Sequence, residues 1–303
     1  MNKVYLFPGQ GSQFVGMGKD IFEQSDIAKQ IYQSASDILG FDLVDISFNG
    51  PEDKLRQTQF TQPAIFVHSV AVYNLLKEHN LFPSAVAGHS LGEFSALVAA
   101  NVLTFEDALN IVKVRSSEMA KAGSIQPGSM AAILGADDEQ IEQICNQDGV
   151  VVPANINALG QIVISGEVDA VASAVETAKS LGIRKAIPLN VSGAFHSPLM
   201  VPAREPLSKI LESVKFNNTD IPVYQNVTAS PETDAEIIKD NILKQLENPV
   251  RWADIITNMI SDGFTDFIEV GPNKVLSGLN RRINRDVNST PIGTFEQIQN
   301  LIA

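Results

Sequence analysis

The sequence predicts an α/β protein in which a parallel sheet flanked by helices is interrupted by a compact unit of different strand order. Short apolar segments alternate with helix-like segments over the first third of the chain and resume after about residue 220. Between residues 128 and 189 the order changes to strand, helix, strand, strand, helix, strand, which is typical of a ferredoxin-like unit. A glycine-flanked turn, Gly88-His89-Ser90-Leu91-Gly92, connects an early strand to a helix.

The individual elements follow from apolar periodicity and from turn residues. Strands are expected where short apolar runs stop at glycine, proline or polar residues: 4–7, 85–87, 130–134, 150–154, 161–165, 184–189, 222–227 and 265–270. Helices are expected where apolar residues recur at a spacing of three and four: 62–78, 93–100, 105–120, 138–146, 168–181, 234–246, 252–262 and 274–285. We therefore expect residues 1–126 and 191–303 to form the larger subdomain, with residues 127–190 inserted as the smaller one.

Composition and charge exclude several classes of protein. The formal net charge is −13 and no basic stripe is present, which argues against a nucleic-acid partner. Apolar runs are broken well before the roughly 18 residues of a membrane span, and Met1-Asn2-Lys3 leads directly into a strand without a visible signal peptide. The single cysteine, Cys145, lies on the apolar side of a predicted helix and permits no internal disulfide. We expect a cytoplasmic protein with no membrane partner and no metal site.

Ser90 lies at the centre of the glycine-flanked turn and is the main candidate for a catalytic group. A tight turn between a strand and a helix presents a serine hydroxyl at the carboxyl edge of a sheet, and the crowded backbone requires glycine at positions 88 and 92. The pattern also occurs by chance in loops. The apolar strand before it and the helix after it favour a nucleophile elbow.

A nucleophilic serine needs a base, and the chain offers four histidines. His89 precedes the serine and should face the opposite side of the backbone. His68 lies within a predicted apolar helix and is best interpreted as packed, and His79 lies at the polar end of that helix. His196 remains, in the loop Gly193-Ala194-Phe195-His196-Ser197-Pro198 after the last strand of the inserted unit. A solvated loop histidine is the alternative interpretation.

An acyl-transfer serine also needs hydrogen-bond donors for the oxyanion that forms during attack on a carbonyl. The backbone N–H of Leu91 suits one donor, because it follows the nucleophile. The loop Pro8-Gly9-Gln10-Gly11 after the first strand suits the second, since glycine lets the backbone approach a substrate. A phosphate-binding loop is disfavoured because no Lys-Ser or Lys-Thr pair follows it.

Arg115 falls on the apolar stripe of the predicted helix 105–120, in register with Ala108, Ile111, Val112 and Met119. A buried guanidinium needs a partner. An internal acid, Glu93 or Glu118, would make it a structural ion pair. A substrate carboxylate held by the guanidinium fork would make it a specificity group.

Several separated motifs together resemble the malonyl-CoA:acyl-carrier-protein transacylase family over essentially the whole chain. In chain order they are Gly9-Gln10-Gly11-Ser12-Gln13, Gly88-His89-Ser90-Leu91-Gly92-Glu93, the helical Arg115, Gly193-Ala194-Phe195-His196-Ser197, Gln225-Asn226-Val227, Asn248-Pro249-Val250-Arg251-Trp252 and Gly271-Pro272. The resemblance implies an α/β-hydrolase-like large subdomain and a ferredoxin-like small subdomain, with the site in the cleft between them.

The resemblance also implies roles for individual residues. Ser90 takes a malonyl group from malonyl-CoA as an ester and passes it to the phosphopantetheine thiol of acyl carrier protein, with His196 as base and then acid. Gln10 and Leu91 supply oxyanion donors, and Arg115 holds the malonyl carboxylate. Three further positions are implied: the Gln245 backbone carbonyl orients the histidine, Phe195 belongs to the malonyl-type motif, and Asn157 and Asn155 line the cleft. No cofactor is implied beyond the thioester substrate.

A neutral carbonyl behind the histidine distinguishes this arrangement from a typical serine hydrolase, in which an aspartate holds the base. We hypothesise that the weaker partner makes the imidazole less basic, so that water attacks the acyl-enzyme slowly and a thiol acceptor wins. The buried guanidinium should reject acetyl-CoA, whereas an extra methyl group is discriminated by only about 1 to 3 kcal/mol.

Two other functions remain open at this point. A serine thioesterase or hydrolase of the same fold would accept water and place an aspartate behind His196, and a non-catalytic carrier-binding module would lack activity. Carrier proteins are usually acidic, so docking onto this acidic chain calls for a local basic patch. The candidates by charge are Arg184, Lys185, Lys274, Arg281 and Arg282. The pathway, fatty-acid or polyketide synthesis, is not specified by these residues.

Overall fold

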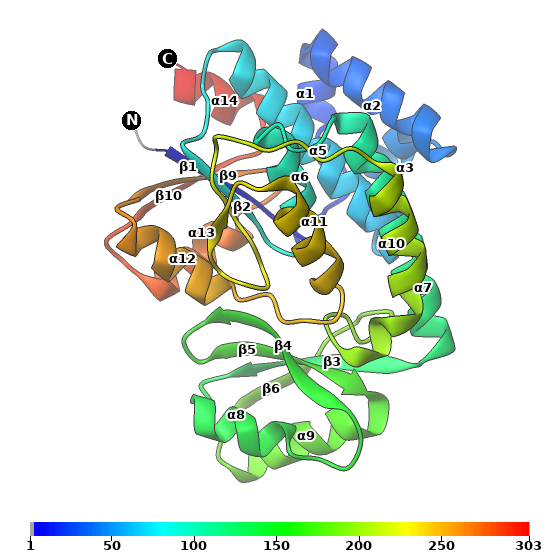
Figure 1. Cartoon of the computed structure of the whole chain (residues 1–303), viewed down its shortest axis with the longest axis vertical. Helices are drawn as coiled ribbons and strands as arrows, with labels where there is room; N and C mark the ends of the chain where they lie inside the picture. Colours follow the sequence, from blue (N-terminus) through cyan, green and yellow to red (C-terminus); the bar gives the residue numbers. More distant parts are fainter. Residues whose placement is uncertain (1–2, 303) are drawn as a thin grey trace.

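The large sheet organises most of the chain. A computed structural model describes residues 3–302, in which a six-stranded sheet runs in the order β10-β9-β1-β2-β7-β8 (Figure 1). Its strands are β1 (Lys3–Phe7), β2 (Ala85–Gly88), β7 (Val223–Tyr224), β8 (Pro231–Glu232), β9 (Asp266–Val270) and β10 (Asn288–Ile292). The first five of this spatial order are mutually parallel and β8 pairs antiparallel with β7. The predicted α/β class with a parallel sheet is confirmed.

Helices cover both faces of this sheet because neighbouring side chains of each strand point to opposite faces. Tyr5 and Phe7 of β1 pack into the larger core, and Val4 and Leu6 pack into the core beneath α12 and α13. The helices of the large subdomain are α1 (Lys19–Gln24), α2 (Asp26–Leu39), α3 (Leu43–Asn49), α4 (Glu52–Leu55), α5 (Thr58–Glu78), α6 (Gly92–Ala99), α7 (Phe105–Ile125), the 3₁₀ helix η1 (Pro198–Ala203), α10 (Arg204–Ser213), α11 (Ala235–Lys244), α12 (Trp252–Ser261), α13 (Val275–Ile283) and α14 (Phe295–Ile302). The predicted elements 62–78 and 105–120 are both extended, to α5 and α7.

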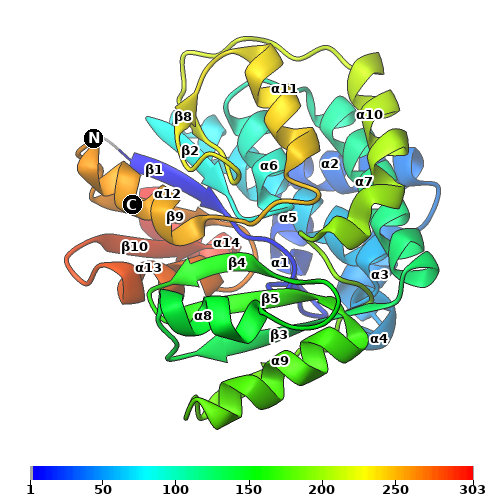
Figure 2. The ribbon, with the colours of Figure 1, turned by 60° about the horizontal axis from the view of Figure 1, so that its bottom comes forward.

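The inserted unit forms a second, four-stranded antiparallel sheet in the order β4-β5-β3-β6. Its elements are β3 (Gly128–Leu134), α8 (Asp138–Cys145), β4 (Val151–Ala158), β5 (Gln161–Glu167), α9 (Val168–Ser180) and β6 (Lys185–Pro188). This order of strands and helices is that of a ferredoxin-like unit. Figure 2 shows α8 and α9 on the outer face of this sheet, with the other face turned toward the large subdomain.

One strand of the small sheet, β4, is hydrogen-bonded to the segment of the large subdomain that precedes α12. The backbone N–H of Ile156 in β4 donates to the carbonyl of Val250 at 2.8 Å, and Val250 in turn donates to Ala154 at 2.9 Å. The pairing of β4 with β5 is irregular on either side of this bridge, between residues 153 and 155 and between 156 and 158. Both irregularities change which side chains face the large subdomain.

The predicted strand 222–227 is wrong beyond its third residue, Tyr224. Only Val223 and Tyr224 pair with β2, and the chain then leaves the sheet. The next two residues use their polar groups elsewhere: Gln225 donates its N–H to Ser230, and the Asn226 side chain contacts the turn around Ser90. The sheet is therefore shortened where two side chains are needed beside the candidate nucleophile.

The helices α1 to α4 (within residues 19–55), strand β10 and helix α14 were not expected from the sequence. Strand β10 forms one edge of the large sheet, and the helices add to the layers that cover it. Within residues 3–302, no helix combines the length and the apolar character needed to cross a bilayer.

Candidate active site

The turn around Ser90 is a nucleophile elbow whose glycines are required by direct contact. A Cβ on Gly88 would overlap the backbone of Gly92, and a Cβ on Gly92 would overlap the carbonyl of Phe7. Ser90 itself has φ 52°, a left-handed conformation that is uncommon for a residue with a side chain. The sheet and α6 therefore meet at closest approach directly beside the serine.

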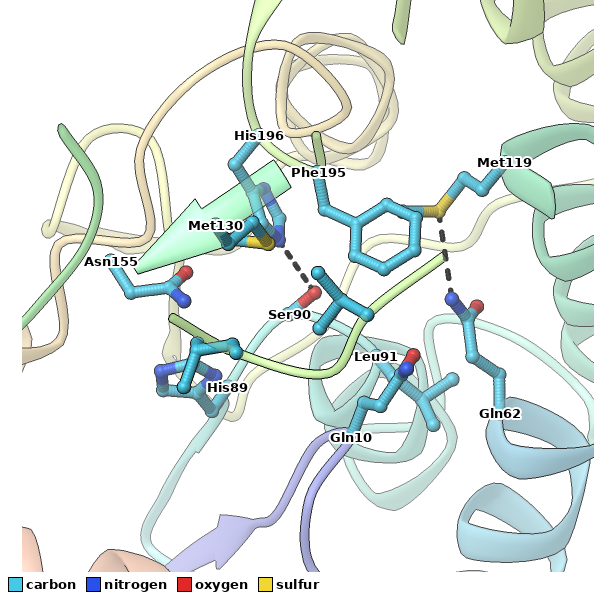
Figure 3. A pocket seen from close by; sticks show the side chains of 12 residues that line it. Gln10, Gln62, His89, Ser90, Leu91, Met119, Met130, Asn155, Phe195 and His196 are labelled. Carbon is cyan, nitrogen blue, oxygen red and sulfur yellow. Dashed lines mark hydrogen bonds between the residues drawn. The ribbon is translucent and has the colours of Figure 1, made fainter. Parts of the chain in front are cut away.

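Ser90 and His196 form the expected pair. Ser90 Oγ lies 2.8 Å from His196 Nε2 (Figure 3). The other ring nitrogen, Nδ1, lies 2.9 Å from the carbonyl oxygen of Gln245 and 3.2 Å from that of Asn248. Because two carbonyls can only accept, Nδ1 carries the proton and Nε2 is left to accept from the serine hydroxyl.

The loop that carries His196 is fixed from its own sequence. Ser197 caps η1 by accepting from the N–H of Leu199, and its hydroxyl donates to the carbonyl of Ala194 at 2.7 Å. His196 is buried, with φ 57°. Burial, together with the positive charge of Arg115, lowers the pKa of the His196 imidazole to about 3. The imidazole is therefore neutral and able to accept a proton across the physiological range.

Arg115 reaches the nucleophile from α7, a helix that Thr104 caps by accepting from Asp107 N–H. Its Nη1 donates to Gln62 Oε1 at 2.7 Å. Its Nη2 donates to Gln245 Oε1 at 2.8 Å and to Ser90 Oγ at 3.1 Å. All three acceptors are neutral, so the guanidinium charge is solvated by amide and hydroxyl dipoles.

Neither acid considered from the sequence forms an ion pair with Arg115 among the described residues. Glu118 pairs with Lys121 on the exposed side of α7, which excludes it as the partner. Glu93 is buried nearby, but its Oε2 accepts from Gln245 Nε2 at 2.6 Å, so that the Gln245 amide separates the two charges. Burial raises the pKa of the Glu93 carboxyl to about 7, and the Arg115 charge opposes that shift.

Gln245 contributes more than the backbone carbonyl that the resemblance implied. Its side chain accepts from Arg115, and its Nε2 donates to the Ser90 carbonyl at 3.0 Å as well as to Glu93. One residue therefore contacts the histidine, the guanidinium and the elbow.

Asn226 also supports the elbow and was not assigned a role from the sequence. Its Oδ1 accepts from the Ser90 N–H at 2.7 Å, and its Nδ2 donates to the Gly88 carbonyl at 2.6 Å. Gln62 was missed as well, although it lies on α5 facing Arg115. The motif Gln225-Asn226-Val227 was the only sequence signal for the first of these residues.

The two expected oxyanion donors lie together beside Ser90. Gln10 and Leu91 both line the same cavity, and neither backbone N–H donates to another residue within 3–302. The reason for Gly9 differs from the expectation. A Cβ there would overlap the carbonyl of His89, so this glycine lets the loop approach the elbow rather than the substrate.

The cavity beside Ser90 holds about 120 Å³, which suits a short acyl group. The residues that line it are Gln10, Gln62, His89, Ser90, Leu91, Met119, Met130, Asn155, Leu189, Val191, Phe195 and His196 (Figure 3). Phe195 is placed on this wall, as the resemblance implied. The nucleophile and base thus face a wall that combines apolar side chains with the polar side chains of Gln10, Gln62, His89 and Asn155.

Asn157 differs from its expected position. Its Oδ1 lies 2.8 Å from His89 Nε2, and it is not among the residues lining the cavity, whereas Asn155 is. The irregular pairing of β4 between residues 153 and 158 accounts for the difference, since it breaks the simple alternation of side chains. Asn157 therefore hydrogen-bonds His89 instead of lining the cavity.

No group of three or more metal-ligating side chains occurs among the described residues. Cys145 is half-buried on α8, and burial raises the pKa of its thiol to about 11. The structure therefore gives no second nucleophile of comparable quality at this cysteine.

The chain matches known proteins over nearly its full length. The family model described as acyl transferase domain matches residues 4–293. The malonyl CoA-acyl carrier protein transacylase of Staphylococcus aureus strain COL is 47% identical over 298 residues, covering 97% of this chain and 96% of the relative.

Solved structures agree with these relatives. An acyl carrier protein S-malonyltransferase from Vibrio cholerae superposes with a TM-score of 0.95 at 41% identity, covering 99% of this chain and 100% of that one. A malonyl-transacylase solved in complex with its type II polyketide acyl-carrier protein superposes with a TM-score of 0.96 at 38% identity, covering 100% and 99%. The chain therefore belongs to the acyl transferase family, among its malonyl CoA-acyl carrier protein transacylases.

Proposed function

We propose that this protein transfers a malonyl group from malonyl-CoA to the phosphopantetheine thiol of acyl carrier protein through a malonyl ester on Ser90. The single observation that carries the proposal is the contact between a buried guanidinium and the nucleophile: Arg115 Nη2 lies 3.1 Å from Ser90 Oγ. A cation at this distance from the reacting oxygen suits an acyl group that bears its own carboxylate two carbons from the thioester carbonyl.

In the acylation half-reaction, the hydroxyl proton of Ser90 passes to His196 Nε2 as Oγ bonds to the thioester carbon. The N–H groups of Gln10 and Leu91 then stabilise the oxyanion. When the carbon–sulfur bond breaks, the proton on His196 goes to the departing coenzyme A sulfur. The Gln245 carbonyl holds the ring throughout by accepting from Nδ1.

The second half-reaction repeats these steps with a different thiol. His196 takes the proton of the phosphopantetheine thiol, the sulfur attacks the malonyl ester, and Ser90 regains its proton. The scheme is ping-pong and uses only side chains, backbone donors and the two thioesters, so it needs no cofactor. Phe195 and Asn155 would contact the acyl group, and Asn157 would act through His89.

The carrier protein is expected to dock on basic side chains at one end of the small sheet. Arg282 on α13 donates to Gln161, which is in register with Leu134, and Leu134 is in register with Lys185. Two strand spacings of about 4.8 Å separate Lys185 on β6 from Gln161 on β5, so Lys185 and the Arg282 that contacts Gln161 lie at the same end of the small sheet. Arg184, Lys274 and Arg281 are exposed in the same parts of the chain.

We further propose a division into residues 1–126 and 191–303 as the catalytic subdomain and 127–190 as the ferredoxin-like subdomain. The first covers the large sheet and the second covers the whole of the small one. A cytoplasmic location is supported by the single cysteine. The product, a malonyl-carrier thioester, would supply extender units for fatty-acid or polyketide synthesis.

Incubation with labelled malonyl-CoA tests the proposal. The wild type should acquire one malonyl group on Ser90 and lose it to added holo carrier protein. Ser90→Ala should acquire none, and Ser84→Ala, outside the elbow, should behave as the wild type. Rapid release of free malonate would indicate a hydrolase, and absence of label would indicate a carrier-binding module; either result would refute the transferase.

A further inference from the structure

The hydroxyl of Ser90 is engaged on two sides. It faces His196 Nε2 at 2.8 Å and, because that nitrogen can only accept, the hydroxyl donates its proton there. Arg115 Nη2 lies 3.1 Å from the same oxygen and can only donate. The guanidinium therefore binds a lone pair of the nucleophile, the kind of electron pair that must attack the thioester carbon.

The surroundings of Arg115 determine which of its contacts can yield. Nη2 has two hydrogens, and they are directed at Ser90 Oγ and Gln245 Oε1. Gln245 cannot turn over, because its amide nitrogen already donates to the Ser90 carbonyl and to Glu93. The Ser90 hydroxyl can leave Arg115 more easily, because its proton is donated to His196 and no bond of its own forces its oxygen to stay on the guanidinium.

A carboxylate that reaches Arg115 competes with Ser90 for Nη2. The guanidinium bond to the Ser90 hydroxyl has one neutral acceptor, whereas a carboxylate is an ionised acceptor and matches the guanidinium fork with two oxygens. Nη1 offers a second hydrogen, since among the described residues it donates to Gln62 alone. The carboxylate should therefore displace the hydroxyl from the guanidinium.

We propose that the carboxylate of the acyl substrate releases Ser90 from Arg115, so that the nucleophile becomes fully competent only when a carboxylate-bearing acyl group is bound. This inference rests on the proposed function. Arg115 would then bind the substrate carboxylate and also control the reactivity of Ser90 Oγ. Neutral acyl groups would be disfavoured in the chemical step as well as in binding.

The same displacement affects the base. Burial and the charge of Arg115 both lower the pKa of His196. A bound carboxylate neutralises that charge, which makes the imidazole a stronger base when the serine proton has to be removed. Glu93 is the other charged group of this network and offsets part of the Arg115 charge through the Gln245 amide.

Acylation of Ser90 then needs no reactant besides the thioester. The Oγ–carbon bond forms as the carbon–sulfur bond breaks, and the hydroxyl proton travels through His196 to the coenzyme A sulfur. The guanidinium stays on the carboxylate of the malonyl ester. After transfer to the carrier thiol, the carboxylate leaves with the product and Arg115 returns to Ser90.

The test uses methanesulfonyl fluoride, a small neutral reagent that sulfonylates serine with loss of fluoride and a proton. The rate of adduct formation at Ser90 is followed by intact-protein mass spectrometry. Arg115→Met should react about fivefold faster than the wild type, because one charged hydrogen bond to the nucleophile is removed. Arg285→Met, an exposed arginine outside the site, should react at the wild-type rate.

Formate provides a second measurement that needs no variant. At saturating formate, with chloride at equal ionic strength as control, the wild type should be sulfonylated several-fold faster, and Arg115→Met should not respond. A folded Arg115→Met that reacts no faster than the wild type overturns the inference, since the guanidinium would then activate the serine. If that variant does not fold, unchanged or slower wild-type sulfonylation in formate overturns it.

Malonyl-ester formation by the same wild-type preparation separates the two claims. If the wild type forms and transfers the malonyl ester but neither formate nor Arg115→Met speeds sulfonylation, this inference alone is contradicted. A wild type that forms no malonyl ester contradicts the proposed function itself.

Discussion

The side-chain oxygen of Asn226 accepts a hydrogen bond from the backbone N–H of Ser90 at 2.7 Å, and its amide nitrogen donates to the carbonyl of Gly88 at 2.6 Å. These two hydrogen bonds fix the backbone of the residues before and after His89, Gly88 and Ser90. They stabilise the left-handed backbone of the nucleophile, which has φ 52°. Asn226 is therefore a positioning residue for Ser90.

Asn226→Ala should lower kcat by about 10- to 100-fold with little change in KM, because a small displacement of a nucleophile costs this much when substrate binding is intact. It should also lower the free energy of unfolding by about 2 kcal/mol, since two buried backbone groups lose their partner. Steady-state kinetics and urea denaturation measure the two effects. Asn218→Ala, which removes an Asn contact with the N–H of Ala235 far from the elbow, is the matched control and should affect stability alone. An unchanged kcat in Asn226→Ala would contradict the positioning role.

Arg115→Ala should lose most malonyl transfer and gain activity toward acetyl-CoA relative to malonyl-CoA. In the proposed function the buried guanidinium holds the substrate carboxylate and an acetyl group leaves it unpaired, which should give a large discrimination between the two thioesters. The ratio of kcat/KM for the two thioesters measures the change. An unchanged preference would remove Arg115 from the specificity assignment.

Glu93 should make stability depend on pH in a defined direction. Burial raises the pKa of this carboxyl from 4.5 to about 7, so the folded protein holds the proton more tightly than the unfolded chain does. That stabilisation is complete below about pH 4.5 and is lost as the pH rises through about 7. Relative to Glu93→Gln, the wild type should therefore lose about 3 kcal/mol of unfolding free energy across this window.

Urea denaturation of both proteins at several pH values measures that difference. The buried histidines titrate in both proteins and cancel in the comparison. The lost acceptor in Glu93→Gln adds only a constant offset. A difference that stays flat between pH 4.5 and 7 would show that Glu93 keeps an ordinary pKa.

The proposed docking surface gives a prediction about the carrier protein. Charge reversal of Arg281 and Arg282 to Glu should raise the KM for the carrier by about tenfold, with the KM for malonyl-CoA unchanged, because rim charges act mainly on encounter. Lys77→Glu with Lys215→Glu makes the same change in net charge on other exposed residues and serves as control. Equal effects of the two double variants would remove this pair from the docking surface.

Local sequence patterns indicated three of the residues that the structure brings together: Ser90, His196 and Arg115. The glycine requirement at 88 and 92 follows from a short-range turn, His196 follows from the exclusion of three other histidines, and Arg115 follows from helical periodicity. Each signal is contained within one element or one loop. The α/β class and the inserted unit were predictable for the same reason, since alternation and periodicity are local.

The supporting network was less accessible because it is long-range and neutral. Gln62 and Gln245 meet on Arg115 from positions 53 and 130 residues away in the chain. Asn226 reaches Ser90 across 136 residues. Uncharged amides produce no charge pattern and no periodic signal. Asn226 was indicated only by the motif Gln225-Asn226-Val227, and no sequence feature indicated Gln62. Asn155 lines the cavity as expected, and the different position of Asn157 depends on strand irregularities that the sequence did not indicate.

The neutral hydrogen-bond partners of His196 Nδ1 support the central claim, which is that the acyl-enzyme prefers a thiol to water. Nδ1 faces two backbone carbonyls, of Gln245 and Asn248, where a serine hydrolase would place a carboxylate. A weakly basic imidazole should activate water poorly and a more acidic thiol readily.

The most direct measurement is the partition of preformed malonyl-Ser90 enzyme in a single turnover with holo carrier protein at working concentration, read as malonyl-carrier against free malonate. Nearly all of the malonyl group should appear on the carrier, and the ester should persist when the carrier is omitted. Free malonate appearing faster than malonyl-carrier would contradict the preference for a thiol.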